Sequence, residues 1–210
     1  MTILDGKKTS EALKQEIAEE VKQLKDQGKK VPHLAAVLVG DDGASLTYVG
    51  SKVKACEQVG FASTLVKLPA DISEEKLLQE IAKLNTNPEI DGYIVQLPLP
   101  KHINEQKILL AIDPTKDVDG FHPANFGRMA LDMEAFIPAT PFGIMELLKR
   151  YKVPTQGKHV VVVGRSHIVG RPISILLSQK GAQGNATVTL THSHTPNLAD
   201  RTRQEDIVVM

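Results

Sequence analysis

Two segments in the first half of the chain carry side chains that could take part in acid–base chemistry. Tyr48 and Lys52 are four residues apart, so a helix would place both on the same side. Gln96 stands where an apolar run that includes Ile94 and Val95 would end as a strand, and ligands gather at the carboxyl ends of strands in open α/β sheets. A solvated lysine beside a half-buried tyrosine, and a glutamine that caps its own loop, are the alternatives without a chemical role.

A pair of acidic residues lies further on, in the segment KDVDGFHPANFG at 116–127. One of Asp117 and Asp119 could reach a site while the other caps a turn. Because Asp-Gly is a common turn pair, a turn without a chemical role is the alternative for this segment.

The segment HVVVVGRSHIVGRP at 159–172 could bind a phosphate group, because it has the pattern of a strand, a turn with two glycines and a helix. Gly164 permits a tight turn, and Gly170 permits a close approach of the backbone to a ligand. A helix N-terminus offers unpaired N–H groups and the positive end of the helix dipole. The spacing departs from G-x-G-x-x-G, so glycines that only aid packing are the alternative.

The side chains around this turn favour one cofactor. Arg165, His167 and Arg171 surround the turn with potential cations, and Ser193 follows the next predicted strand, where a dinucleotide-binding fold contacts the adenosine ribose. NAD-binding folds place an acidic residue there, but the sequence THSHT has none, which favours NADP. His192 and His194 lie in the same segment without a carboxylate or cysteine, so we expect no metal site.

The elements that must position these residues alternate between strands and helices. Apolar runs predict strands at 34–40, 63–69, 91–100, 159–164, 186–192 and 206–210. Helical spacing and capping residues predict helices at 10–27, 45–60, 73–84, 104–112, 140–151, 171–181 and 197–203. Residues 113–139 show no sustained period, so we expect an irregular segment that is functional or a linker. The pattern predicts an α/β fold.

Composition excludes several classes of protein. The 210 residues include 25 basic and 25 acidic side chains, so we expect neither a general nucleic-acid binder nor a membrane-surface binder. No apolar run approaches the roughly 20 residues of a spanning helix, and the N-terminus has no secretory h-region. One cysteine, Cys56, cannot form an intramolecular disulfide and fits the reducing cytoplasm.

Together and in this order, five motifs closely resemble the bifunctional methylenetetrahydrofolate dehydrogenase/cyclohydrolase family. They are YVGSK at 48–52, DGYIVQLPLP at 91–100, KDVDGFHPANFGR at 116–128, PATPFGIMELL at 138–148 and GRSHIVGRP at 164–172. The resemblance implies two α/β domains around a cleft: a catalytic, folate-binding domain at 1–139 and a Rossmann-like, parallel-sheet NADP domain at 140–210. It also implies a homodimer formed through the nucleotide domains and a tetrahydrofolate derivative as substrate.

The resemblance also implies a reaction and a set of site residues. The reaction is NADP-dependent oxidation of 5,10-methylenetetrahydrofolate to 5,10-methenyltetrahydrofolate, followed by hydrolysis to 10-formyltetrahydrofolate. The family's catalytic lysine matches Lys52, its tyrosine Tyr48, the glutamine that touches the lysine Gln96, and the aspartate that holds the pterin Asp119. The cofactor residues match Gly164, Arg165, Ser166 and Ser193. Thr140 and Pro141 match a segment of the family's cleft.

The sequence departs from the family in two places. The family continues past residue 210 with a strand, a segment rich in glycine and proline, and a returning helix. Three predicted strands in the second half are also fewer than the roughly five or six of a complete nucleotide-binding sheet. We therefore expect that a C-terminal part is lacking; a naturally short protein is the alternative. Residues 179–185 form a longer turn than is common, which would alter only a surface loop.

Two other functions remain open from the sequence. The chain could be a non-catalytic fragment that binds folate or nucleotide, which the expected loss of a C-terminal part would favour. It could also be a dehydrogenase for another small substrate, such as an amino acid. An amino-acid site would need a basic clamp for the substrate carboxylate, rather than the set of Lys52, Gln96 and Asp119.

Overall fold

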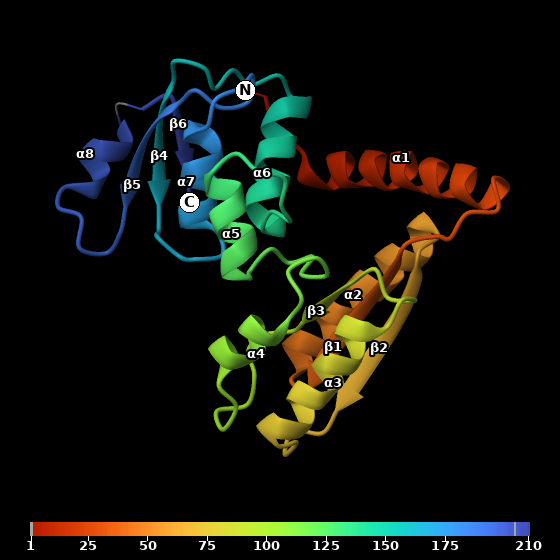
Figure 1. Ribbon diagram of the computed structural model, residues 1–210. Helices are drawn as coiled ribbons and strands as arrows, with labels where there is room; N and C mark the ends of the chain where they lie inside the picture. Colours follow the sequence, from red (N-terminus) through yellow and green to blue (C-terminus); the bar gives the residue numbers. More distant parts are fainter. Residues whose placement is uncertain (1, 204) are drawn as a thin grey trace. The chain divides into compact units, whose positions relative to one another are not determined.

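The computed structural model describes residues 2–203 and 205–210, which form two compact units. The first unit is Lys7–Val118, and the second combines the residues before Lys7 with the segment from Asp119 onward. Each unit contains a three-stranded parallel sheet with helices packed on it, so the predicted α/β fold with parallel sheets is confirmed (Figure 1). No helix among the described residues is long and apolar enough to cross a membrane.

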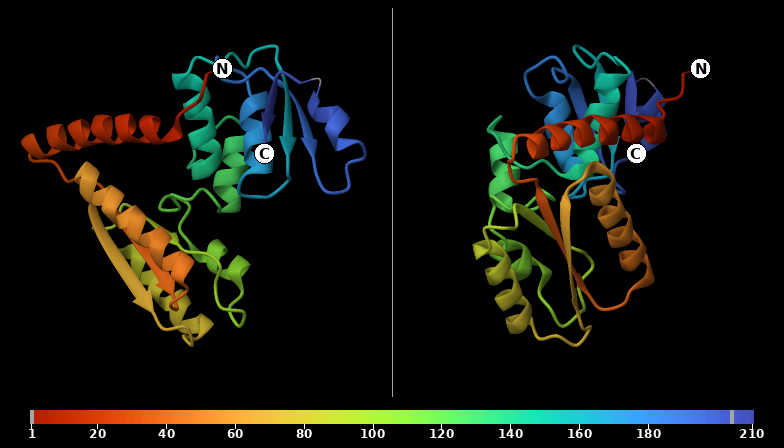
Figure 2. Two further views of the ribbon diagram at one scale, coloured as in Figure 1. Left: turned by 180° about the vertical axis from the view of Figure 1, so that it is seen from behind. Right: turned by 90° about the vertical axis from the view of Figure 1, so that its right-hand side faces the viewer.

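The first unit alternates helices and strands along the chain. Its elements are α1 (Gly6–Asp26), β1 (His33–Val39), α2 (Gly43–Val59), β2 (Ala62–Leu68), α3 (Glu74–Thr86), β3 (Gly92–Val95) and α4 (Glu105–Ala111). The strands run parallel in the order β2-β1-β3. Figure 2 shows this sheet between α2 and α3 in the right-hand view.

The side chains of β1 alternate between two cores, which explains why its residues from Leu34 to Val39 are all apolar. Val37 belongs to a core with Leu77 and Ile81 of α3, whereas Leu38 belongs to a core with Val49 of α2. Successive residues of a strand point to opposite faces, so a strand covered on both faces needs apolar residues at every position. The central strand is therefore buried on both faces, whereas every second residue of β2 is exposed. Polar side chains can collect at the carboxyl edge of this sheet.

The second unit repeats this plan with more helix on one face. Its elements are α5 (Pro123–Ala130), α6 (Ala139–Arg150), β4 (His159–Val163), α7 (Gly170–Ser178), β5 (Thr187–Thr191), α8 (Leu198–Arg203) and β6 (Ile207–Val209). The strands run parallel in the order β5-β4-β6. Leu148 of α6 and Ile173 of α7 pack against Val160 and Val162 of β4 in one core.

Two segments differ from the prediction. The stretch 113–139, expected to be irregular, contains α5, which begins where the His122 imidazole accepts a hydrogen bond from the N–H of Ala124 and Pro123 occupies the first turn. The strand expected at 91–100 ends at Val95. Prolines 98 and 100 have no N–H to donate, so they cannot continue a ladder.

Candidate active site

Tyr48 and Lys52 lie side by side on α2, in the unit that contains the first sheet. Only three residues separate β1 from α2, so the first turns of the helix lie near the carboxyl end of that strand. Val49, between the two residues, is buried against the sheet. The Lys52 Nζ lies 4.6 Å from the centroid of the Tyr48 ring, within the range of a cation–π interaction. Lys52 is half-buried, and Tyr48 is 55% exposed.

Gln96 stands at the carboxyl end of β3, on the face of the sheet that α2 covers. Its backbone N–H donates to the carbonyl of Val37 at 2.9 Å, which continues the pairing of β3 with β1. Ile94 belongs to the core beneath α2, and the alternation of side chains puts Gln96, two residues later, on the same face. The Gln96 Nε2 donates to the carbonyl of Leu97 at 2.6 Å, so the amide does cap its own loop.

Asp117 and Asp119 differ in their surroundings. Asp117 is buried at 2% exposure, and its backbone forms a parallel bridge with Tyr93 of β3. Asp119 is half-buried and begins the second unit, whereas Lys52 and Gln96 belong to the first. The next residue, Gly120, has φ of +67°, and a Cβ there would lie 2.7 Å from the carbonyl oxygen of Phe136. The predicted turn at Asp119 and Gly120 is therefore present, and it requires glycine because a side chain at residue 120 would be strained and would clash with the backbone.

The acidic segment is held in place by residues that no sequence motif indicates. The Lys116 Nζ donates to the carbonyls of Leu84 and Asn87 at 3.0 and 2.6 Å, so a cation closes the C-terminus of α3. Asn85 donates to the carbonyl of Ala111 and accepts from the N–H of Asp113. These contacts join positions about 26 to 32 apart in sequence, so no local pattern could have indicated them.

The turn between β4 and α7 needs both of its glycines. Gly164 has φ of +116°, and a Cβ on Gly170 would lie 1.9 Å from the carbonyl oxygen of Gly164. The Ser166 hydroxyl accepts from the N–H groups of Val169 and Gly170 at 3.1 and 3.2 Å, and the Ser166 carbonyl accepts from the N–H of Arg171.

This arrangement corrects the expectation that the start of α7 offers unpaired N–H groups. Residues 169, 170, 171 and 173 all donate to protein oxygens, and Pro172 has no N–H. An anion at the start of α7 must therefore be held by side chains or by the residues of the turn that precede Val169.

A cavity of about 500 Å³ lies beside this turn. It is lined by Phe126, Arg165, Arg171, Ser174, Ile175, Leu190 and His192. Partial desolvation, the guanidinium of Arg165 and the imidazole of His194 lower the pKa of His192. The His192 Nδ1 also accepts a hydrogen bond from the N–H of His194 at 3.2 Å, which a neutral imidazole can do. Ser193 is exposed in the same turn and does not line the cavity.

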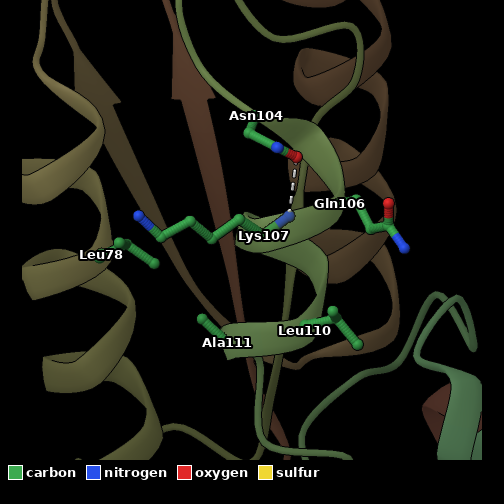
Figure 3. A pocket seen from close by; sticks show the side chains of 6 residues that line it. All are labelled: Leu78, Asn104, Gln106, Lys107, Leu110 and Ala111. Carbon is green, nitrogen blue, oxygen red and sulfur yellow. Dashed lines mark hydrogen bonds between the residues drawn. The ribbon is translucent and has the colours of Figure 1, made fainter.

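A second cavity, of about 460 Å³, lies between α3 and α4 and contains none of the predicted site residues (Figure 3). Lys107 extends toward Leu78 across it, and the Lys107 Nζ is paired with Glu74 at 2.6 Å. Within the described ranges, no group of three histidine, cysteine or acidic side chains could hold a metal ion.

Comparisons with known proteins assign both halves of the chain. The family model for the catalytic domain of tetrahydrofolate dehydrogenase/cyclohydrolase matches residues 4–119, and the model for its NAD(P)-binding domain matches residues 138–210. The bifunctional protein FolD of Flavobacterium johnsoniae is 70% identical over 209 residues, and that of Christiangramia forsetii is 65% identical over 210. The alignments cover the whole of this chain and 71% and 70% of those proteins.

Solved structures agree with this assignment. The crystal structure of FolD from Campylobacter jejuni has a TM-score of 0.94 and 46% identity, and the alignment covers 100% of this chain and 73% of that one. The FolD of Trypanosoma brucei, whose crystal structure is complexed with NADP cofactor and inhibitor, has a TM-score of 0.91 and 38% identity, with 99% and 70% covered. The chain therefore belongs to the tetrahydrofolate dehydrogenase/cyclohydrolase family.

Proposed function

We propose that this chain oxidises 5,10-methylenetetrahydrofolate to 5,10-methenyltetrahydrofolate with NADP⁺ and hydrolyses that product to 10-formyltetrahydrofolate. Membership of the family supports both reactions, because its two domain models match in sequence order. The observation that carries the proposal is the Lys52 amine above the Tyr48 ring, at the carboxyl edge of the first sheet.

Lys52 is the central residue of the proposed hydrolysis. The Lys52 amine lies 4.6 Å from the centroid of the Tyr48 ring. In the hydrolysis, either an ammonium polarises a ring nitrogen of the folate while water attacks the methenyl carbon, or a neutral amine activates the water. Gln96, on the face of the sheet that α2 covers, would orient the lysine, and the exposed Tyr48 ring would stack on the folate.

Asp119 would bind the pterin end of the substrate. A carboxylate is an acceptor only, and the pterin offers an amino group and a ring N–H as donors. Two N–H donors directed at one carboxylate fix the orientation of a planar ring. The closely packed Gly120 that follows Asp119 would hold the carboxylate in one position.

The second unit fits the dinucleotide. Gly164 and Gly170 pack closely at the turn, and the exposed Arg165, Ser166 and Ser193 carry side-chain donors around it. We propose that Gly164, Arg165 and Ser166 bind the phosphate groups, with Ser193 near the 2′-phosphate. When bound, NADP⁺ supplies a hydride acceptor at C4 of its nicotinamide ring.

The remaining proposals concern the domains, assembly and location. We propose a catalytic domain at 1–139 and an NADP domain at 140–210. We also propose a homodimer through the second unit, supported by β5 as an outer strand of the described sheet with Leu190 exposed. Light scattering would test it, since a dimer has twice the 22.9 kDa mass of the chain. We also propose a cytoplasmic location, which the free Cys56 supports. Membership of the family supports a role in one-carbon metabolism, and we propose that this role includes supply to purine biosynthesis.

A spectrophotometric assay of the full chain with 5,10-methylenetetrahydrofolate and either NADP⁺ or NAD⁺ tests the proposed function. We expect NADP-dependent oxidation followed by hydrolysis. Binding of folate without turnover would instead show a non-catalytic binding protein. Turnover of an amino acid, with none of the folate, would show a dehydrogenase of another class.

A further inference from the structure

The cavity beside the glycine turn contains two arginines from the two ends of that turn. Arg165 directly follows Gly164, and Arg171 directly follows Gly170, the first residue of α7. Both line the same cavity of about 500 Å³. Because a guanidinium stays charged at every physiological pH, the cavity holds two fixed positive charges.

These two arginines differ from most others in the chain. Three arginines donate from the side chain to a carbonyl or carboxylate oxygen: Arg128, Arg150 and Arg203. Within the part of the chain that the structure describes, neither Arg165 nor Arg171 has such an oxygen partner. Two uncompensated guanidiniums at one cavity indicate an anionic ligand, and the planar fork of each can give two parallel hydrogen bonds to phosphate oxygens.

The backbone around the turn strengthens the need for side-chain donors. Ser166 already accepts the N–H groups of Val169 and Gly170, so these donors are not open to a phosphate. The Ser174 hydroxyl donates to the carbonyl of Gly170 at 2.7 Å, so its proton is also used. An anion in this cavity would therefore depend on side chains, namely the two guanidiniums and the imidazole of His192.

We propose that Arg171 acts with Arg165 as a two-arginine clamp for the 2′-phosphate of NADP, which makes Arg171 a specificity-determining residue. The inference rests on the proposed function, in which the second unit binds NADP. A phosphate monoester carries a charge of about −1.5 to −2 near pH 7, which matches two guanidiniums. Both arginines are exposed, and Phe126, Ile175 and Leu190 supply the apolar part of the cavity lining.

Isothermal titration of the full chain with adenosine 2′,5′-bisphosphate and with 5′-AMP tests the clamp, because the two probes differ only in the 2′-phosphate. We expect Arg171→Ala to weaken binding of the bisphosphate roughly 10- to 100-fold, as for a lost hydrogen bond to a charged group, and that of 5′-AMP less than about twofold. Arg165→Ala should act in the same way. Arg171→Lys should lose less, because it keeps the charge without the fork.

Arg201→Ala is the matched control, since Arg201 is an exposed arginine of the same unit that does not line the cavity. It should bind both probes like the parent chain. If Arg171→Ala weakened both probes equally, or neither, Arg171 would not bind the 2′-phosphate and the clamp would be wrong. If inorganic phosphate bound as tightly as the bisphosphate, the cavity would be a general anion site and the clamp would again be wrong. If the parent chain showed no preference for the bisphosphate, the NADP proposal itself would fail.

Discussion

The two units use the same contacts at the amino edges of their sheets and different residues at the carboxyl edges. In the first unit, the central strand β1 begins at His33, whose N–H donates to the carboxylate of Asp91 at 2.8 Å. Lys30 pairs with the same carboxylate at 2.8 Å, and the His33 Nε2 lies 2.8 Å from the Thr64 hydroxyl on β2.

The second unit repeats this set of contacts, which we name the amino-edge clasp. The central strand β4 begins at His159, whose N–H donates to Asp206 at 3.0 Å. Lys158 pairs with that carboxylate at 2.8 Å, and the His159 Nε2 lies 2.9 Å from the Thr189 hydroxyl on β5. In both clasps the threonine stands two positions beyond the residue that pairs with the histidine.

The carboxyl edges show no such likeness. One has Tyr48, Lys52 and Gln96, whereas the other has a glycine turn with Arg165 and Arg171. At the amino edges, both sheets therefore use the same contacts to join their strands. At the carboxyl edges, the two sheets carry different side chains, which suit two different kinds of chemistry. This division agrees with the general rule that ligands bind at the carboxyl ends of strands in open α/β sheets.

The largest effect is expected at the carboxyl edge of the first sheet. Lys52→Met should lower the rate of methenyltetrahydrofolate hydrolysis by roughly 100-fold or more, because it removes an acid–base group, while folate binding stays measurable. Stopped-flow absorbance would measure the hydrolysis, and fluorescence titration the binding. Lys54→Met is the matched control, an exposed lysine of the same helix that should keep the parent rate. Near-parental hydrolysis by Lys52→Met would remove this lysine from the mechanism.

The glycine turn of the second unit should be the next most sensitive. Gly170→Ala places a Cβ against the backbone oxygen of Gly164, which cannot move alone, so we expect a loss of about 3 kcal/mol in the free energy of unfolding. Gly143→Ala, in α6 with open space around it, should instead stabilise by up to about 1 kcal/mol. Urea unfolding would measure both. Equal stabilities for the two variants would contradict the close packing at the turn.

The two clasps should weaken together in acid. Partial burial tends to raise the pKa of Asp91, but hydrogen bonds from Lys30 and the His33 N–H outweigh it and hold the pKa below the usual 3.8. The hydrogen bond from Lys158, with that from the His159 N–H, lowers the pKa of Asp206. Since the folded-state pKa values are the lower ones, this stability is present above about pH 4 and is lost as the pH falls through them.

Melting temperatures between pH 7 and pH 2 would test the clasps. Asp91→Asn should cost no more than about 1 kcal/mol at pH 7, because solvent screens an exposed ion pair, and Asp206→Asn should also lower the melting temperature. Both differences should shrink as the pH falls toward 2, because the parent carboxylates become protonated. If a variant still melted below the parent chain at pH 2, the clasps would stabilise the fold through packing rather than through charge.

The smallest effect concerns His192. Without a ligand, partial desolvation and the neighbouring Arg165 and His194 lower the pKa of His192. A bound phosphate dianion would instead favour the protonated imidazole. Binding of adenosine 2′,5′-bisphosphate should therefore tighten a few-fold between pH 8 and pH 6.5, and His192→Asn should remove that dependence. A pH-independent affinity in the parent chain would show that the imidazole does not face the phosphate.

The sequence predicted most of the fold, because buried parallel strands are continuous apolar runs with glycines and caps between them. It missed α5, whose start depends on the side chain of His122, a weak cap by general preference. It also missed the clasps, because His33 and Asp91 are 58 residues apart while His159 and Asp206 are 47 apart, so no fixed period relates them. For the site, the sequence predicted that Tyr48 and Lys52 lie side by side. It did not predict that Lys116 and Ser166 anchor their segments by hydrogen bonds, because only the fold brings their partners close.

Hydrogen exchange of the full chain with and without each ligand tests the division between the two edges most directly. A folate analogue should protect peptides from α2 and from residues 92–100, and NADP should protect residues 164–171 and 187–195. The amide groups of His33, Asp91, His159 and Asp206 should exchange as in the free protein. Protection at these amino edges, with none at the carboxyl edges, would contradict the account.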